Sequence, residues 1–325
     1  MSRESECHMS RDMVQLTKWI ILPSSLVLVV ALRRYNRKNV ENKQKVPFEG
    51  AKLCIGGHKY GVWIVGNRCY KRFQTRGRGE REYNFLRIAN EKTCDWYDFV
   101  PRLANPSVVE RNDSKWLVME NILSGFKDGV IMDVKMGRRT WGANTSKAKR
   151  KRKAQKDRIY TSFEFGVRLV AAEIKSEKFG DTKLLGDKVG YPVTNRRQLQ
   201  TGILNFLNTK ELRLRATTIL RRIMKVFKNE RGFIFYSSSL LFSYDFAAKS
   251  RADTLRVKMI GTFICFVCVC ELMISYFFFL PDFAHVEPSS ELDESYIVGL
   301  QTLVKILSLG LNDDNDKVDI VDVSE

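Results

Sequence analysis

The sequence predicts an α+β fold built from antiparallel sheets and a few long helices. Three patterns support this prediction. Short apolar runs separated by Gly and Asn fill residues 46–102, as is typical of an antiparallel sheet. A long amphipathic pattern over residues 196–229 is typical of one or two helices. Strand-like apolar runs then return between residues 233 and 260.

Length, charge and cysteine usage limit the class of protein. With 325 residues, the chain can bury the core of one large domain or of two ordinary ones. The formal net charge of +18 implies an anionic partner: nucleic acid, a membrane surface or a phosphorylated small molecule. The seven cysteines form no paired CxxC knuckles and have no histidines at metal spacing, so we expect a reduced, intracellular protein without structural zinc.

The first 45 residues are typical of a leader, with an apolar stretch at residues 16–32 that is followed by a basic cluster. The stretch is near the lower length limit for a membrane span, and it contains Lys18 and Pro23. Two interpretations stay open. It is either a signal anchor that leaves its basic side in the cytosol, or a poorly ordered or wrongly assigned leader.

The remaining elements follow from local patterns. Residues 46–102 should form a small β-rich lobe that includes a helix over residues 79–92, and the basic run at 147–158 has good helix propensity. Further strands are predicted at residues 115–123, 129–137, 233–245 and 255–260, and a last helix at residues 293–307.

The order of parts in the first half is typical of an ATP-dependent phosphotransferase: a strand lysine, a helix with glutamates, then a hinge. In this interpretation Lys71 holds the nucleotide phosphates, and Glu80 or Glu82 orients that lysine. Taken alone, Lys71 is better explained as an exposed strand lysine. The chain has no GxGxxG over its first hairpin, no HRD and no DFG, so it is not an ordinary protein kinase.

Three motifs, in this order, resemble the inositol polyphosphate kinase family: "IMDVKMG" at 131–137, "SSSLLF" at 237–242 and "DFAH" at 282–285. The resemblance covers nearly all of residues 50–307. It includes "GGH" at 56–58, "RGEREYNFL" at 78–86, "MENI" at 119–122 and "GLQTLVKIL" at 299–307.

The resemblance implies a two-lobed inositol polyphosphate kinase fold, SAICAR-synthase-like and distantly protein-kinase-like, with antiparallel sheets in both lobes. Residues 46–120 would form the N-terminal ATP-binding lobe. Residues 121–310 would form the C-terminal catalytic and inositol-phosphate-binding lobe, followed by an acidic tail at 311–325.

The resemblance also assigns the nucleotide contacts. Glu120 and Ile122 match the hinge that offers backbone groups to adenine, and Asp133 matches the carboxylate that receives the ribose hydroxyls. Lys135 matches the catalytic lysine that neutralises the phosphoryl group in flight. Without the resemblance, Asp133 and Lys135 could be a solvated pair on a strand, worth about 0 to 1 kcal/mol.

The metal and the second substrate are assigned in the same way. Asp282 matches the catalytic carboxylate that binds Mg²⁺, and Ser239 matches the hydroxyl beside that metal. The residues that match the family's contacts to the inositol phosphate are Gln74, Arg76, Lys149, Lys156 and His285. The basic run is also typical of a nuclear-import signal or a solvated helix face; the interval from Lys135 favours the substrate role for Lys156, and residues 150–153 are assigned to solvent or import.

An apolar insertion at residues 261–281 separates "VKMI" from "DFAH", where the family runs straight through. A helical membrane span would place its ends about 30 Å apart, too far for Asp282 to share a metal with Ser239. A hairpin would expose an apolar patch. A third interpretation is a translated intron, since GT can lie in the Gly261 codon and AG can lie across the codons for Pro281 and Asp282.

We therefore expect ATP- and Mg²⁺-dependent phosphorylation of a soluble inositol phosphate, by in-line transfer to a ring hydroxyl. The short connection from Lys135 to Gly166 favours an open, multikinase-like site. The alternatives are a hexakisphosphate kinase that makes pyrophosphates and a non-catalytic basic anion-binding protein on a kinase scaffold.

We expect a monomer in the cytoplasm and nucleus that has no specific nucleic-acid partner. The alternative is a kinase domain held on the cytosolic side of a membrane through residues 16–32 or 261–281.

Overall fold

The computed structural model describes residues 52–53, 62–75, 77–143, 145–175, 182–186, 190–229, 231–261, 264–269, 274–279, 286–309 and 311. The chain divides into two compact units, Met1–Val46 and Pro47–Glu325, and every described residue belongs to the second unit. The apolar stretch at 16–32 and all of the acidic tail after Leu311 lie outside the described residues.

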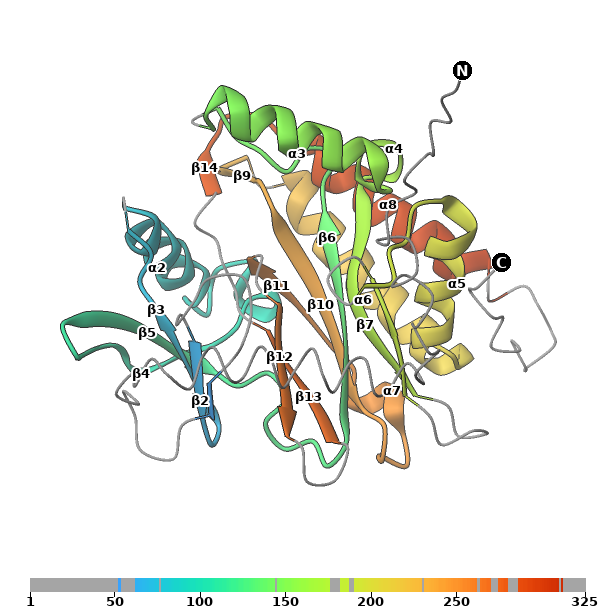
Figure 1. Cartoon of the computed structure of the whole chain (residues 1–325), viewed down its shortest axis with the longest axis horizontal. Coiled ribbons are helices and arrows are strands. Elements are labelled where there is room, and N and C mark those ends of the chain that lie inside the picture. Colours follow the sequence, from blue (N-terminus) through green and yellow to red (C-terminus); the bar gives the residue numbers. More distant parts are fainter. Residues whose placement is uncertain are drawn as a thin grey trace, which may run out of the picture. The chain divides into compact units, whose positions relative to one another are not determined.

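Five antiparallel strands form the first sheet, in the order β1-β2-β3-β5-β4 (Figure 1). Two of its hairpins turn on residues that adopt positive φ: Gly66 between β2 and β3, and Asn112 and Asp113 between β4 and β5. The elements of this part are β1 (Lys52–Leu53), β2 (Val62–Val65), β3 (Arg68–Arg72), α2 (Arg78–Ala89), η2 (Tyr97–Phe99), β4 (Leu103–Arg111) and β5 (Ser114–Glu120).

The second sheet is also antiparallel, with five strands in the order β11-β10-β6-β7-β8. Its strands are β6 (Gly129–Met136), β7 (Val167–Lys175), β8 (Thr182–Leu185), β10 (Ser238–Asp245) and β11 (Arg256–Gly261). Two further strand pairs stand apart from it: β9 (Phe233–Phe235) with β14 (Val286–Pro288), and β12 (Ile264–Val269) with β13 (Ile274–Phe279).

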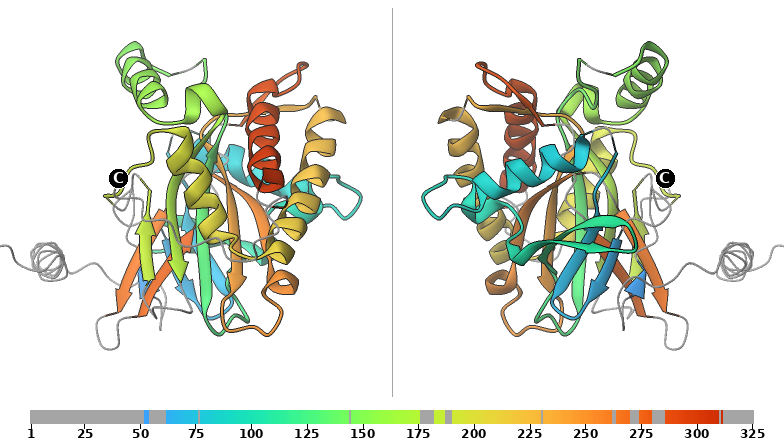
Figure 2. Two further views of the ribbon diagram at one scale, coloured as in Figure 1. Left: turned by 90° about the vertical axis from the view of Figure 1, so that its right-hand side faces the viewer. Right: turned by 90° about the vertical axis from the view of Figure 1, so that its left-hand side faces the viewer.

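Long helices pack on one face of the second sheet (Figure 2). The amphipathic segment predicted as one or two helices forms two, because the Thr209 hydroxyl accepts a hydrogen bond from Leu212 N–H and caps a new helix. The Tyr296 ring stacks on Phe227 at 4.1 Å, which joins α8 to α6. The helices are α3 (Lys147–Ile159), α4 (Ser162–Phe165), α5 (Arg196–Phe206), α6 (Lys210–Asn229), α7 (Arg251–Thr254) and α8 (Glu294–Leu309).

Two glycines allow α8 to approach the start of β7. Gly166 has φ +68°, and a Cβ atom at Gly299 would lie 2.5 Å from the Gly166 carbonyl oxygen. Any side chain at Gly299 would therefore push the helix off the sheet. This close contact holds α8 against β7 and against β6, the strand that carries Asp133 and Lys135.

The predicted α+β class with antiparallel sheets in both parts is confirmed. The helical span considered for residues 261–281 is wrong where the structure describes that segment, because residues 264–269 and 274–279 form paired strands. In the described part of the chain, no helix combines the length and the apolar character that crossing a membrane requires.

Candidate functional site

A buried ion pair joins the first sheet to helix α2. Alternation along β3 turns Cys69 and Lys71 inward, and Lys71 is only 3% exposed. The Lys71 ammonium lies 2.7 Å from both carboxylate oxygens of Glu82, which is equally buried. Glu80 is exposed, because residues two apart on a helix point about 200° apart. The assignment of Lys71 as an exposed lysine is therefore wrong, and Glu82 rather than Glu80 orients it.

Asp133 and Lys135 lie on one face of β6, in the middle of the second sheet. Across the sheet, Lys135 pairs with Ser239 and Asp133 pairs with Leu241. The exposed fractions of Asp133 and Lys135 are 0% and 3%, so the solvated pair considered above is wrong. Burying charge in this way is costly, which makes a pair of opposite charges on one strand face a strong candidate for a functional site.

A small apolar cluster shares that face and is separate from the main core. Ile131 alternates with Asp133 and Lys135 along β6, and Leu241 lies across from Asp133 on β10. The full cluster is Ile122, Ile131, Val170, Ala171, Leu241 and Ile260. This apolar cluster forms a floor that can contact a flat base. The carboxylate and then the ammonium follow it in line, in the order in which a ribose and phosphates follow the base of a nucleotide.

Residues 120–124 leave the end of β5 and lead to the second sheet; we call this segment the hinge. The Glu120 N–H donates to the Arg102 carbonyl at 2.8 Å, and the Asn121 N–H donates to the Asn67 carbonyl at 2.8 Å. Ile122 N–H donates no hydrogen bond to the described residues. It is the backbone group of the hinge that can donate to a ligand.

Ser237 connects Lys135 to helix α3. Its carbonyl accepts from the Lys135 ammonium at 3.1 Å, and its hydroxyl donates to the Thr140 carbonyl at 2.6 Å. The same hydroxyl accepts from Lys153 at 2.9 Å, so Lys153 does not face solvent as the sequence-based assignment of residues 150–153 had it. Ser237 has φ +62°, a backbone conformation that is uncommon for serine and costly to hold.

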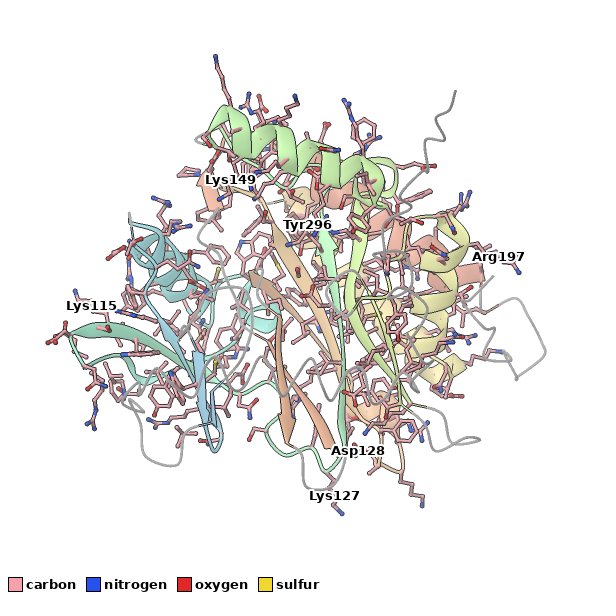
Figure 3. The ribbon with its side chains drawn as sticks, viewed as in Figure 1. Lys115, Lys127, Asp128, Lys149, Arg197 and Tyr296 are labelled. Atoms are coloured by element: carbon pink, nitrogen blue, oxygen red, sulfur yellow. The ribbon has the colours of Figure 1, made fainter. Side chains whose placement is uncertain are left out.

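Helix α3 carries the predicted basic contacts. Lys149, near the first turn, is exposed, and basic side chains project along the helix (Figure 3). Lys156 is half-buried, with its ammonium 5.4 Å from the centre of the Tyr160 ring. Asp157 anchors the helix, because its carboxylate accepts from Thr140 N–H at 3.0 Å and from the Thr140 hydroxyl at 2.8 Å.

Of the other predicted site residues, some are described by the structure and some lie outside the described residues. Ser239 is fully buried opposite Lys135, and within the described residues its hydroxyl has no hydrogen-bond partner. The Gln74 side-chain nitrogen, between β3 and α2, is likewise buried without a partner there. Arg76, Asp282 and His285 lie outside the described residues. In the described part, no three His, Cys, Asp or Glu side chains gather as a metal site.

Comparison with known proteins identifies relatives of one kind. The family model "Inositol polyphosphate kinase" matches residues 116–308, more than half of the chain. Inositol polyphosphate multikinase alpha of Arabidopsis thaliana is 24% identical over 278 residues, which cover 78% of this chain and 90% of that protein. Inositol hexakisphosphate kinase 3 of Mus musculus is 32% identical over 139 residues, 40% of this chain and 34% of that protein.

Two further matches bear on extent and fold. Inositol polyphosphate multikinase beta of Arabidopsis thaliana is 32% identical over 114 residues, 33% of this chain and 38% of that protein. In this match and in that to hexakisphosphate kinase 3, the chain thus spans little more than a third of the relative. The crystal structure of inositol phosphate multikinase Ipk2 from S. cerevisiae with ADP and Mn²⁺ has a similar fold. The TM-score is 0.56 at 21% identity, over 76% of this chain and 100% of that one.

Proposed function

The chain belongs to the inositol polyphosphate kinase family, and from this membership we propose that it transfers the γ-phosphoryl group of ATP to a hydroxyl of a soluble inositol phosphate. One observation supports the proposal most directly: Asp133 and Lys135 are buried in line on one strand face, beside an apolar floor. A carboxylate and an ammonium in line can bind two parts of a nucleotide, the ribose hydroxyls and the transferred phosphate.

In the proposed mechanism, Ile122 N–H donates to adenine over the apolar floor and Asp133 accepts from the ribose hydroxyls. Lys71, held by Glu82 at 2.7 Å, binds the nucleotide phosphates. Lys135 places a positive point charge beside the phosphoryl group, where negative charge must be stabilised during transfer. Catalysis then depends on positioning and charge neutralisation, as is usual for phosphoryl transfer.

We propose Mg²⁺ as the metal, together with ATP. The Ser239 hydroxyl fits this role, because it is buried, lacks a partner among the described residues and lies across from Lys135. A hydroxyl oxygen is a ligand suited to a hard cation, and the bound ion would neutralise phosphate charge. The S. cerevisiae relative has a divalent ion, Mn²⁺, with ADP. Asp282 remains the proposed carboxylate ligand.

We propose a multikinase-like substrate range. The match to multikinase alpha extends over 90% of that protein, whereas the match to hexakisphosphate kinase 3 covers 34% of it. Gln74, Lys149 and Lys156 would contact the ring phosphates, with Arg76 and His285. The exposed basic residues of α3 supply the charge that a polyanionic substrate needs.

We also propose that the ATP-binding lobe ends and the catalytic lobe begins at residues 120–121, where β5 ends. The protein would act as a monomer in the cytoplasm and nucleus, and the exposed cations of α3 would serve as the import signal.

One assay tests the proposal. Purified full-length protein is incubated with ATP, Mg²⁺ and a panel of inositol phosphates from tris- to hexakisphosphate, and products are separated by charge. Transfer to tris- and tetrakisphosphates supports the multikinase function, while transfer only to the hexakisphosphate indicates the pyrophosphate-forming alternative. No transfer to any member, by the full-length protein and by a variant that lacks residues 261–281, rejects the kinase function. In that case, stabilisation by inositol phosphates without stabilisation by ATP and Mg²⁺ would identify a non-catalytic anion-binding protein.

A further inference from the structure

Arg256, the first residue of β11, holds the hinge by its carbonyl groups. Its guanidinium Nη1 donates to the carbonyls of Ile122 and, at 3.1 Å, Ser124. The guanidinium also lies 4.2 Å from the centre of the Phe126 ring, just beyond the hinge. One side chain of the second sheet therefore fixes the segment that leaves the first sheet.

Lys258 lies two residues further along β11, on the same side of the strand. Its ammonium donates to the carbonyls of Asp98 and Val100, both at 3.1 Å, and is 3.8 Å from a Glu120 carboxylate oxygen. That same Glu120 oxygen accepts from Arg102 N–H at 3.0 Å. Lys258 thus joins the start of the hinge to the segment 98–102 behind it.

Both cations and the hinge line one cavity of about 460 Å³. Burial lowers the pKa of Lys258, and the carboxylate of Glu120 opposes that decrease; burial also lowers the pKa of Arg256. Charged donors that have lost part of their hydration bind carbonyl oxygens more strongly than solvated ones. Arg256 binds two carbonyls of the hinge, and Lys258 pairs with the carboxylate of Glu120, the first hinge residue, so both cations of β11 act on one short segment.

The sheet register explains why the position of the hinge matters. Lys258 pairs with Leu241 on β10, and Leu241 pairs with Asp133 on β6, so the three residues form one row across the sheet. The contacts from β11 therefore fix the hinge relative to the strand that carries Asp133. Holding Ile122 N–H and Asp133 at a constant separation preorganises the site for adenine and ribose.

We propose that Arg256 and Lys258 are positioning residues that clamp the hinge from β11 and set the affinity for the nucleotide. The expected effect on the affinity for ATP rests on the proposed function, whereas the expected effect on hydrogen exchange in the hinge does not. It assigns neither residue a contact with the substrate or a part in the chemical step.

The first test measures amide hydrogen exchange in the full-length protein without ligand. In Arg256→Met and Lys258→Met, exchange at residues 120–124 should be at least about tenfold faster, because the first variant loses the hydrogen bonds to the Ile122 and Ser124 carbonyls and the second loses the ion pair with Glu120. Arg251→Met is the matched control: Arg251 also lies over a phenylalanine ring, 3.9 Å from Phe246, and donates to its carbonyl at 3.0 Å, but in α7. Unchanged hinge exchange in both variants, or the same acceleration in the control, overturns the clamp.

The second test compares the two substrates. Arg256→Met and Lys258→Met should raise the KM for ATP about tenfold and leave the KM for the inositol phosphate unchanged. Arg256→Lys, which keeps a cationic donor group but loses the planar guanidinium, should recover part of the ATP affinity and serves if the methionine variant does not fold. Equal effects on both KM values reject the clamp. Failure of the kinase proposal would appear differently, as a wild-type protein with no turnover whose hinge exchange still depends on Arg256.

Discussion

Replacing Glu82 by leucine tests the buried ion pair most severely. The change removes the two oxygens that lie 2.7 Å from the Lys71 ammonium, and Lys71 is a residue only 3% exposed. Removing one partner of a buried pair costs about 3 to 5 kcal/mol. Domains of this kind are stable by only about 5 to 15 kcal/mol, so Glu82→Leu should lose roughly a fifth or more of its unfolding free energy. Urea denaturation followed by fluorescence measures this loss.

A double variant separates stability from function. Lys71→Met combined with Glu82→Leu removes both charges and keeps apolar volume, so stability should recover to within about 1 kcal/mol of the wild type. Nucleotide binding should not recover, because the ammonium that would hold the phosphates is absent. Glu80→Leu is the control on the same helix, and its exposed site predicts a change within about 0.5 kcal/mol and normal turnover.

Two results would refute this reasoning. If the double variant is as unstable as Glu82→Leu, the cost comes from packing around residue 82 and not from an uncompensated charge. If the double variant binds ATP as the wild type does, the pair is a structural element of the first sheet, and Lys71 has no role with phosphates. Isothermal titration with ATP and Mg²⁺ decides the second point.

Four further predictions follow. Lys135→Ala should lower kcat by about a hundredfold or more with little change in either KM, because its charge acts chiefly in the transition state. Lys156→Ala should raise the KM for the inositol phosphate about tenfold and leave that for ATP unchanged. Burial raises the pKa of Glu173 from 4.5 to about 8, so the folded chain keeps a proton that the unfolded chain releases. The contribution of Glu173 to stability is therefore greatest below pH 4.5 and decreases as the pH rises to about 8. The decrease amounts to a few kcal/mol, at about 1.4 kcal/mol per pKa unit. Glu173→Gln should flatten this slope in pH-dependent denaturation. Transcripts should lack the 21 × 3 = 63 nucleotides that encode residues 261–281, and protein without them should be soluble and active; retention in essentially all messages would reject this.

The elements of the fold were predictable because apolar residues recur in this chain with a period of about two in the strands and of about 3.6 in the helices. The sequence was also sufficient to choose between Glu80 and Glu82 as the partner of Lys71. Phe85, Leu86 and Ala89 form the buried face of α2, and Glu82 precedes them by three, four and seven residues. Glu80 is not at these spacings, so the helical phase alone selects Glu82.

Other parts of the site were not predictable in this way. Lys153 contacts Thr140 and Ser237, which are distant in sequence and meet only after the second sheet and α3 have packed. Ser237 adopts a left-handed conformation that local propensity disfavours for serine. The one local signal was Asp157, a single acid at the end of a basic run, which anchors α3 through Thr140.

The register of β11 determines where Asp282 would lie if residues 261–281 were absent. Gly261 ends the strand opposite Ser238, next to the pair formed by Ile260 and Ser239. Deleting the segment would place Asp282 at the position of Gly261, opposite Ser238 and one residue along the strand from the row that contains Ser239 and Lys135. A 21-residue helix would hold Asp282 about 30 Å away, whereas the pairing of β12 with β13 sets Ile264 and Phe279 only about 5 Å apart. The hairpin can therefore return the chain to the end of β11, which a helical span cannot do. If full-length protein is as active as the deletion variant, the hairpin is a genuine part of the enzyme; if only the deletion variant is active, the end of β11 must continue directly into "DFAH".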